Sequence, residues 1–485
     1  MPTTQPMPTT QPMPTTQPMP TTQPNILILF TDDQRFDTIR ALGNEAIHTP
    51  NMDRLVARGT TFRDGYIPGG SSGAVCMPSR AMLMTGRYLY RLEGEGQGIA
   101  AEHLMLPEYL RGQGYTTFGT GKWHNGPAAF ARCFSDGGEI FFGGMDDHWN
   151  VPACDFDPTG RYPDTRPHRI DFGPTQPIIP KRWDHITPGK HSSELFAETA
   201  IDFLRGHTSD DPFLLYVAFM APHDPRTMPA EFREMYDPDA IELPENFRLE
   251  HPFDNGDLYT RDELLAAHPR TPVEIRRHLA DYYGMISHLD AQIGRILDAL
   301  DESGHGEDTL IVFAGDNGLA LGRHGLMGKQ NLYDHSVHVP LIFAGPGVPA
   351  GQQTDARAYL LDIYPTLCDL MGLPTPPSVD GQSLRPAIQD GAAGRETLYF
   401  AYQDIQRALL GERYKLIEYC VDGARHTQLF DMQSDRLEMN DLSALPEYAP
   451  EIAALREEMQ RARLVYNDVQ AQGQRFWARY ENSHG

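Results

Sequence analysis

The sequence predicts an α/β protein with a large, mostly parallel sheet sandwiched by helices and a smaller C-terminal α+β domain. Four short apolar runs lack the polar alternation of a half-exposed strand, so they are typical of strands buried on both faces. Helical patterns separate these runs, and strands that alternate with helices form parallel sheets. The predicted strands are Ile26–Phe30, Tyr115–Thr120, Phe213–Phe219 and Thr309–Ala314, and the predicted helices are Asn51–Arg58, Ser79–Met84, Ser193–Leu204 and Glu274–Leu300.

The length of the chain and one proline-rich segment predict two unequal domains. At 485 residues the chain exceeds the roughly 250–300 residues at which a single core stops growing. The segment from Pro374 to Pro386 interrupts the pattern, and beyond it the sequence indicates strands at Tyr414–Tyr419 and Gln428–Met432 and a helix at Pro450–Val465. We therefore expect a main α/β domain over residues 25–394 and a smaller domain over residues 395–485.

The first 24 residues are four copies of Met-Pro-Thr-Thr-Gln-Pro, which we interpret as a low-complexity tail. They contain neither a basic segment nor an apolar segment of the length that a secretory signal needs. This favours a cytoplasmic protein, or a periplasmic or secreted one if the sequence lacks its native leader. With 40% hydrophobic and 22% charged residues, the composition is that of a globular protein that is not inserted in a membrane.

The net charge and the cysteines exclude several classes of function. A formal charge of −25 disfavours binding to nucleic acid, because that affinity depends on clustered lysine and arginine. The five cysteines show no CxxC or regular spacing, so neither a disulfide framework nor a zinc site is indicated. Any anion site in this acidic chain must be a local cationic pocket.

Polar side chains follow the predicted strands at the edge of the sheet where α/β proteins bind ligands. Asp32 and Asp33 follow the first strand, and Asp316 and Asn317 follow the last. Three carboxylates and an amide form a hard-oxygen set that suits calcium or magnesium. The alternative is that Asp32 and Asp316 simply cap helices, which aspartate commonly does.

Cationic side chains follow the other two strands. Lys122 and His124 come after one strand and His223 after the other, which suits a pocket for a tetrahedral oxyanion, although a single histidine is more often structural. Cys76 precedes Pro78, a residue typical of the first turn of a helix, so we expect the cysteine at a helix N-terminus, where a thiolate is favoured. A buried, inert cysteine is the alternative.

At these residues the sequence resembles the type I sulfatases of the alkaline phosphatase superfamily. The run from Cys76 to Arg87 looks like the family signature without a gap, and four further motifs follow in the family's order over roughly residues 25–442. These motifs are Lys122-Trp123-His124, Pro222-His223, Asp316-Asn317-Gly318 and His324-Gly325-Leu326-Met327-Gly328-Lys329. The resemblance implies an alkaline phosphatase-like fold and hydrolysis of sulfate esters.

The resemblance also implies a cofactor and a role for each site residue. A separate maturase oxidises the signature cysteine to formylglycine, whose hydrate has one hydroxyl to attack sulfur and a second whose deprotonation expels sulfate. The implied calcium ligands, with magnesium as the alternative ion, are Asp32, Asp33, Cys76, Asp316 and Asn317. By this resemblance, Arg80 would hold the formylglycine, and Lys122 and Lys329 would contact sulfate oxygens. His124 would act as the base, and His223 would protonate the leaving alcohol.

Two positions leave alternatives open. His324 lies where relatives also carry a histidine, but a turn residue capping a loop explains it nearly as well. Asn317 departs from the histidine of phosphonate monoester hydrolases and choline sulfatases, which favours arylsulfatase-like and carbohydrate sulfatases.

A basic segment indicates the substrate. Between Arg161 and His191 there are four arginines, two lysines and three histidines against three aspartates. We expect Arg166, Arg169 and Arg182 to contact a second anionic group of a sulfated saccharide, with a solvated surface loop as the alternative. The competing functions are a phosphodiester or phosphonate monoester hydrolase and a non-catalytic binder of sulfated glycans.

Overall fold

The computed structural model describes residues 23–162, 166–168 and 179–482. The repeats before residue 23 and Arg169 lie outside the described residues. Within the described ranges, no helix combines the length and the apolar character needed to cross a membrane.

The main sheet has eight strands, in the order β12-β2-β11-β10-β1-β9-β5-β6. The five strands from β10 to β6 run parallel to their neighbours, and β11 pairs with β10 and β2 in antiparallel fashion. The four predicted strands form the centre of this sheet, so the predicted fold class is confirmed. The strands are β1 (Asn25–Thr31), β2 (Gly59–Phe62), β5 (Thr116–Lys122), β6 (Asp136–Phe141), β9 (Phe213–Ala218), β10 (Thr309–Gly315), β11 (Leu341–Ala344) and β12 (Gln352–Thr354).

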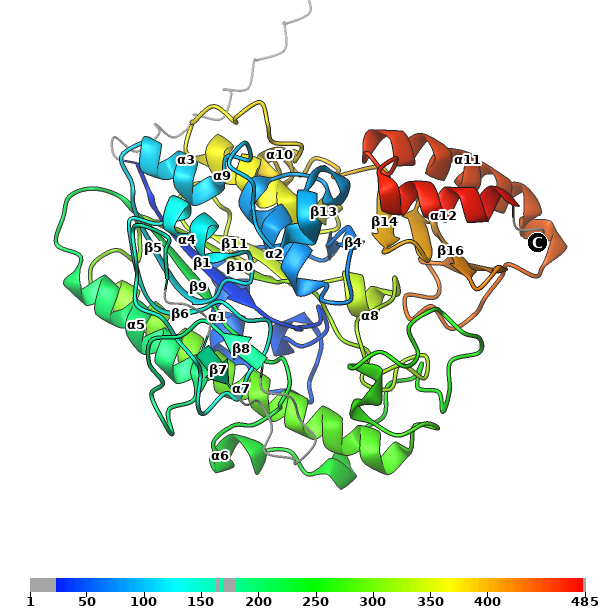
Figure 1. Ribbon diagram of the computed structural model, residues 1–485, viewed down its shortest axis with the longest axis horizontal. Helices are drawn as coiled ribbons and strands as arrows, with labels where there is room; N and C mark the ends of the chain where they lie inside the picture. The colour runs from blue at the N-terminus through cyan, green and yellow to red at the C-terminus, as the bar shows by residue number, and fades with distance from the viewer. Residues whose placement is uncertain (1–22, 163–165, 169–178, 483–485) are drawn as a thin grey trace, which may run out of the picture.

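Helices cover both faces of this sheet, because alternate side chains of each central strand enter two different cores. Ile26 and Ile28 of β1 pack in one core, whereas Leu27 and Leu29 pack in the other. Figure 1 shows the helices of the two cores on opposite sides of the sheet. The first core includes α2 (Cys76–Thr85), α3 (Leu106–Gly112), α4 (Pro127–Cys133) and α9 (Ile363–Leu370), and the second includes α1 (Pro50–Arg58), α5 (Ser192–Gly206) and α7 (Pro272–Glu302).

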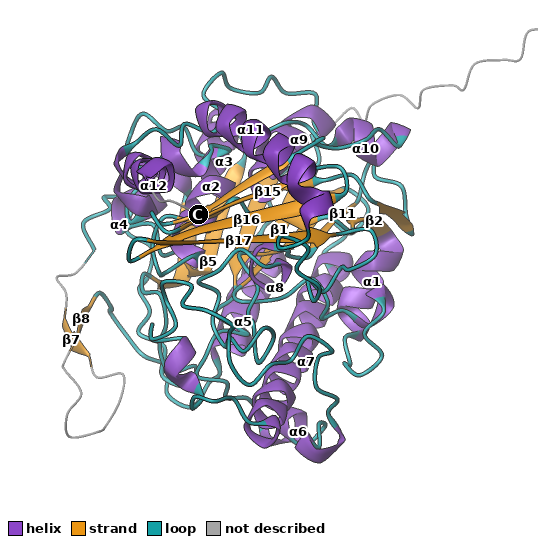
Figure 2. Cartoon of the chain, turned by 90° about the vertical axis from the view of Figure 1, so that its right-hand side faces the viewer, coloured by secondary structure: helices purple, strands orange, loops and turns teal. Residues whose placement is uncertain are grey.

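A second sheet of five strands follows in the C-terminal part, in the order β17-β16-β15-β14-β4. Two helices lie over it (Figure 2). Its strands are β14 (Leu398–Tyr402), β15 (Gln406–Leu410), β16 (Tyr414–Val421) and β17 (Ala424–Asp431), with β4 (Gly69–Gly70) from the N-terminal part, and its helices are α11 (Ala449–Val465) and α12 (Ala471–Asn482).

The sequence pattern missed β14, β15 and α12. β15 contains Arg407, which is fully buried and donates to Asp468 at 2.6 and 2.9 Å, so a charged residue interrupts the apolar run that would have indicated a strand. Strand β4 pairs in parallel with β14, so residues far apart in the sequence complete one sheet. The domain boundary near residue 395 stays a prediction.

Candidate active site

The ends of β1 and β10 bring four oxygen-bearing side chains together. Asp32 and Asp33 follow β1, and Asp316 and Asn317 follow β10, its parallel neighbour. The backbone N–H of Asp33 donates to Asp316 Oδ1 at 3.0 Å, and Asn317 Nδ2 donates to Asp33 Oδ1 at 2.7 Å. All four side chains are buried, so the structure gathers the predicted oxygen set in one place.

Cys76 is the first residue of α2 and lies against this set. Its Sγ atom is 3.5 Å from Lys122 Nζ and 3.5 Å from His124 Nδ1, and ligand atoms of Asp32, Cys76 and Asp316 lie within 4.8 Å of one another. Burial, together with the charges of Asp32 and Asp316, raises the pKa of the thiol to about 11. Desolvation thus outweighs the charges of Lys122 and Lys329, and it opposes the thiolate that we expected at the helix N-terminus.

Arg80 joins α2 to the carboxylates. It lies four residues after Cys76 and hence on the same face of the helix. Its Nε and Nη2 atoms lie 3.0 and 2.8 Å from Asp316 Oδ2, and Nη1 donates to the carbonyl of Lys122 at 2.9 Å. The fully buried guanidinium also lies 5.1 Å from the centre of the Phe30 ring. Arg80 thus fixes the start of α2 relative to the ends of two strands.

Two buried lysines hold the aspartates. Lys122 Nζ donates to Asp32, and Lys329 Nζ donates to Asp33 Oδ1 at 2.5 Å. Burial alone would raise the pKa of Asp32, but Lys122 and weaker contributions from other cations hold it well below its ordinary value. Burial and the charge of Asp32 raise the pKa of Asp316 to about 7. The site therefore holds closely balanced opposite charges in a desolvated environment.

Two histidines lie at the same site. His124 lies beside Cys76, and burial together with the charge of Lys122 lowers its pKa well below the ordinary value. His223 lies beyond the end of β9, with Nε2 3.8 Å from Asp33 Oδ2. The structure thus brings every predicted catalytic and metal-ligating residue to one edge of the main sheet.

The residues fit a hard divalent cation. Asp32 Oδ1 and Asn317 Oδ1 are buried atoms for which the described residues offer no hydrogen-bond donor. A buried acceptor without a donor costs free energy, and a metal ion is one way to satisfy it. The oxygen atoms of three carboxylates and one amide match the preferences of calcium and magnesium.

His324 has partners of its own. Its Nε2 atom lies 3.2 Å from Asn246 Nδ2, and its ring stacks on Tyr333 with a centroid distance of 4.1 Å. The residue also adopts a left-handed backbone with φ of 53°. These contacts match the alternative of a turn residue better than that of a substrate contact.

The basic segment contains fewer available cations than its composition indicates. Arg182 Nη1 donates to the carbonyl of Tyr162 at 3.2 Å. Arg166 begins the short strand β7 (Arg166–His168), which pairs with β8 (Ile179–Lys181), and its side chain lies outside the described residues. The roles of these arginines and of Arg169 in substrate binding stay predictions.

Other cations of this segment are bound within the protein. His185 Nε2 lies 2.9 Å from Glu139 Oε2, and Lys190 pairs with Glu198. His191 is fully buried and caps the N-terminus of α5. The count of basic residues therefore overstates the positive charge that faces solvent.

Three residues that contact the site escaped the sequence reasoning. Asp224 and Arg261 form an ion pair directly behind His223, and His148 Nε2 donates to the carbonyl of His223 at 3.0 Å. The position of Asp224 next to His223 was a usable signal. Arg261 and His148 are distant in sequence and belong to no motif, so no pattern indicated them.

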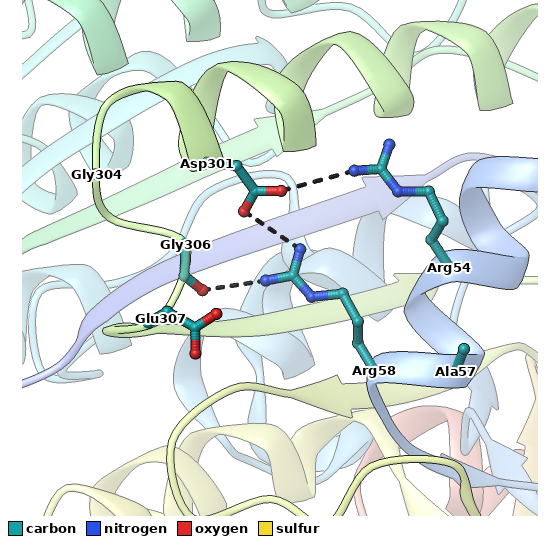
Figure 3. A pocket seen from close by; sticks show the side chains of 7 residues that line it. All are labelled: Arg54, Ala57, Arg58, Asp301, Gly304, Gly306 and Glu307. Atoms are coloured by element: carbon teal, nitrogen blue, oxygen red, sulfur yellow. Dashed lines mark hydrogen bonds and ion pairs between the residues drawn. The ribbon is translucent and has the colours of Figure 1, made fainter.

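A surface hollow lies away from this site. Arg54 and Arg58 of α1, Asp301 of α7 and the loop before β10 line it, and both arginines pair with Asp301 (Figure 3). The hollow lies near the residues that precede β10, whereas Asp316 and Asn317 of the site follow the same strand, so the two lie at opposite ends of it. Both of its arginines are already paired with Asp301, so we do not take it as a second site for an anionic substrate.

Comparison with known proteins identifies the class that this fold and site define. The sulfatase family profile matches residues 24–373, and a profile described as N-sulphoglucosamine sulphohydrolase, C-terminal, matches residues 322–464. The chain belongs to the sulfatase family of the alkaline phosphatase superfamily. It is a sulfuric ester hydrolase, which disfavours the alternative of a non-catalytic glycan binder.

Its relatives include enzymes that act on saccharides and on aryl esters. The chain is 25% identical to N-acetylglucosamine-6-O-sulfatase of Bacteroides thetaiotaomicron, with 92% of this chain and 87% of the relative covered. It is 28% identical to an arylsulfatase of Clostridium perfringens, with 89% and 93% covered.

Solved structures share the fold. A protein in complex with its substrate D-glucosamine-2-N,6-O-disulfate matches with a TM-score of 0.71 at 23% identity, over 93% of this chain and 99% of that one. The phosphonate monoester hydrolase of Agrobacterium radiobacter matches with a TM-score of 0.71 at 24% identity, over 92% and 96%. The likeness confirms the alkaline phosphatase-like architecture.

Proposed function

We propose that this sulfatase cleaves sulfate monoesters with a formylglycine hydrate made from Cys76. The observation that carries the proposal is the position of Cys76 at the start of α2, 3.5 Å from both Lys122 Nζ and His124 Nδ1. Ligand atoms of Asp32 and Asp316 lie within 4.8 Å of Cys76 Sγ. A side chain at this position reaches both the cations that suit sulfate and the carboxylates that suit a metal ion. The modification requires a formylglycine-generating maturase as a partner.

The residues that would hold the divalent cation are Asp32, Asp33, Asp316, Asn317 and the modified Cys76, with calcium as the expected ion and magnesium as the alternative. Buried oxygens without donors on Asp32 and Asn317 support this choice. The cation supplies Lewis acidity toward the sulfate oxygens. A hydrated aldehyde suits this site better than a thiol, because hard cations prefer oxygen ligands to sulfur.

The lysines and Arg80 provide the anion-binding side. Lys122 and Lys329 are buried ammonium groups that contact the carboxylates of Asp32 and Asp33. A cation on the same carboxylates would compete with the lysines for these oxygens and leave their N–H groups to contact sulfate. In a water-excluded site such donors stabilise the negative charge that develops in the transition state. Arg80 fixes the start of α2 and so positions the residue at 76.

The two histidines move protons at opposite ends of the reacting group. His124 Nδ1 contacts Sγ of Cys76, which is where a base for the second hydroxyl of the hydrate must lie. His223 presents Nε2 toward Asp33, one of the proposed metal ligands, at 3.8 Å from Oδ2. His223 serves as the acid that protonates the alcohol.

The natural substrate proposed is a sulfated saccharide, with small aryl sulfates as accepted surrogates. Support comes from relatives named for N-acetylglucosamine-6-O-sulfate and aryl sulfates and from the solved complex with a disulfated glucosamine. Arg166, Arg169 and Arg182 are proposed to contact a second anionic group. Their simultaneous replacement by glutamine is expected to weaken turnover of a disulfated saccharide and to leave that of a small aryl sulfate unchanged. Equal effects on both substrates would contradict this part of the proposal.

The test of the chemistry combines mass spectrometry with activity. The peptide that contains Cys76 is expected to show the mass loss of conversion from thiol to aldehyde. The same sample is expected to release sulfate from an aryl sulfate, to stop when a chelator removes divalent cations and to recover with added calcium. The matched control is Cys76→Ala, which folds around the same helix but cannot be converted. Undiminished sulfate release by Cys76→Ala would overturn the proposal.

The second candidate is hydrolysis of phosphodiesters or phosphonate monoesters, favoured by the structural match to a phosphonate monoester hydrolase. The same cationic site would stabilise a phosphoryl transition state. Asn317, where those enzymes carry a histidine, supports the sulfatase assignment. Rates on an aryl sulfate and the matching aryl phosphodiester, measured with one enzyme sample, decide between the two.

A further inference from the structure

Behind His223 lies an ion pair that no part of the proposed chemistry uses. Asp224 Oδ1 is 3.3 Å from His223 Nδ1, and Arg261 Nη1 donates to the same Asp224 oxygen at 3.0 Å. We propose that Asp224, held by Arg261, is the positioning residue that aims His223 Nε2 at the leaving oxygen of the substrate. The inference rests on the proposed function, in which His223 is the acid.

The contacts on Nδ1 determine the orientation of the His223 ring. Nδ1 lies 2.8 Å from the carbonyl oxygen of Asp224 and 3.3 Å from its carboxylate, so two acceptors face this nitrogen. Both are acceptors only, hence Nδ1 carries a hydrogen and Nε2 is the atom that exchanges a proton with the substrate. A ring flip would remove Nδ1–H from both acceptors and turn a carbon atom toward the site.

Arg261 keeps the Asp224 carboxylate in place. Both of its terminal nitrogens donate to Asp224, and Nη1 also donates to Asp262 Oδ1 at 2.6 Å. The carboxylates of Asp224 and Asp262 are both 9% exposed, whereas the Arg261 side chain is 42% exposed. A paired, bidentate contact limits rotation of a carboxylate far more than a single hydrogen bond does.

The segment that carries Arg261 also connects the acid to the sulfate side of the site. Asp262 Oδ2 accepts from Gln330 Nε2 at 2.7 Å, and the same nitrogen donates to the carbonyl of Gly73 at 2.9 Å. Gln330 is next to Lys329, and Gly73 is three residues before Cys76. Arg261 therefore relates the position of His223 to that of the residues proposed to bind sulfate.

The backbone around His223 is fixed independently of the Asp224 side chain. The N–H of His223 donates to the carbonyl of Met220 at 3.1 Å, and its own carbonyl accepts from His148 Nε2 at 3.0 Å. Loss of the Asp224 carboxylate is therefore expected to loosen the ring, whose Nδ1 then keeps only the carbonyl oxygen of residue 224 at 2.8 Å, and to leave the loop in place. This separates a positioning role from a purely structural one.

The positioning role has a specific chemical consequence. When the bond between sulfur and the ester oxygen breaks, its electron pair stays on that oxygen, and the proton from His223 Nε2 neutralises it. A good leaving group, such as an acidic phenol, tolerates the negative charge without this proton, whereas an alkyl or sugar alcohol does not. A misaligned acid therefore slows poor leaving groups more than good ones.

The experiment measures kcat/KM at one pH for a series of aryl sulfates whose phenols differ in acidity. The enzyme is the full chain with divalent cation bound and modification of Cys76 verified by mass. For Asp224→Ala, we expect a loss of about 10-fold or more with the least acidic phenol and of less than about 3-fold with the most acidic, as general acid catalysis contributes roughly 10²–10⁴-fold. Asp224→Asn keeps one acceptor oxygen, so its loss with the least acidic phenol is expected to be smaller than that of Asp224→Ala.

Two variants serve as references. His223→Gln removes the acid itself and is expected to show the steepest dependence on phenol acidity. Asp262→Ala removes the other carboxylate from Arg261 and has no hydrogen bond to His223, so its losses are expected to be equal across the series. Unfolding midpoints of all variants show which of them fold, and Arg261→Gln, at a half-exposed position, replaces Asp224→Ala if that variant does not.

The outcomes separate the inference from the function on which it rests. If kcat/KM of Asp224→Ala depends on phenol acidity as that of the converted parent chain does, while the dependence for His223→Gln is steeper, the inference alone is overturned. If kcat/KM of His223→Gln depends on phenol acidity no more steeply than that of the parent chain, the role of His223 as the acid is overturned, and the inference with it. Absence of sulfate release from every aryl sulfate by the converted, metal-loaded chain overturns the proposed function.

Discussion

His191 provides a direct test of how buried histidines control stability with pH. Its Nδ1 atom accepts from the backbone N–H of Ser193 at 3.2 Å and so caps α5, and its Nε2–H donates to the carbonyl of Thr227 at 2.8 Å. Protonation of Nδ1 would place two N–H groups against each other. Burial, with the charge of His148, accordingly lowers the pKa of His191 from 6.5 to about 3. The folded protein therefore holds this ring neutral.

The sign of the effect follows from the direction of this shift. Because the folded pKa is lower than the unfolded value, the unfolded chain binds the proton more readily below about pH 6.5. The stability contributed by neutral His191 is present above that pH and is lost as the pH falls toward 3. Linkage between the two pKa values gives a loss of about 2 kcal/mol between pH 7 and pH 5.

The matched variant is His191→Asn, since asparagine is a good N-cap but does not titrate. The assay is urea unfolding at pH 7 and pH 5 for both chains. From pH 7 to pH 5 the free energy of unfolding is expected to fall for both chains. The fall is expected to be about 2 kcal/mol smaller for the variant than for the parent chain. The lost packing of the ring lowers the stability of the variant at both pH values and cancels in the difference. An equal pH dependence of the two chains would refute the reasoning.

Three further predictions concern packing, geometry and metal. Lys415→Met removes the buried cation that lies 2.7 Å from both Asp334 and Glu438, and urea unfolding is expected to show a loss of about 3–5 kcal/mol in the free energy of unfolding. Gly121→Ala would place a Cβ 2.0 Å from the backbone oxygen of Ala218, at a residue with φ of 90°. The clash is expected to displace the neighbouring Lys122 and so to lower kcat for an aryl sulfate, and an unchanged kcat would contradict this. Calcium is expected to raise the midpoint of thermal unfolding after chelation, and an unchanged midpoint would count against the oxygen site.

The local sequence was sufficient for four central strands of the main sheet, β1, β5, β9 and β10, whereas β2, β6, β11 and β12 were not predicted. β1, β9 and β10 are each built around an uninterrupted apolar run, so these strands are visible in the sequence, whereas β5 also contains threonine and glycine. Asp32, Asp33, Asp316 and Asn317 could be found because they follow two of these strands directly, and parallel strands end at one edge. Cys76, Arg80 and Lys329 do not follow these strands, and the resemblance to the family motifs indicated their roles. The C-terminal sheet was predicted only in part, because Arg407 and its partner Asp468 are buried together and conceal the apolar pattern of β15.

By itself the sequence determined the family, the fold class and the set of residues that meet at the site, since these depend on short motifs and on local periodicity. Only the tertiary structure decided what surrounds each of them. His191 counts as a cation in the sequence but is a buried helix cap whose pKa is lowered, and burial raises the pKa of the Cys76 thiol despite its helix N-terminus. Arg261 meets Asp224 across 37 residues. Burial and long-range pairing set these properties, and neither is written in the neighbouring residues.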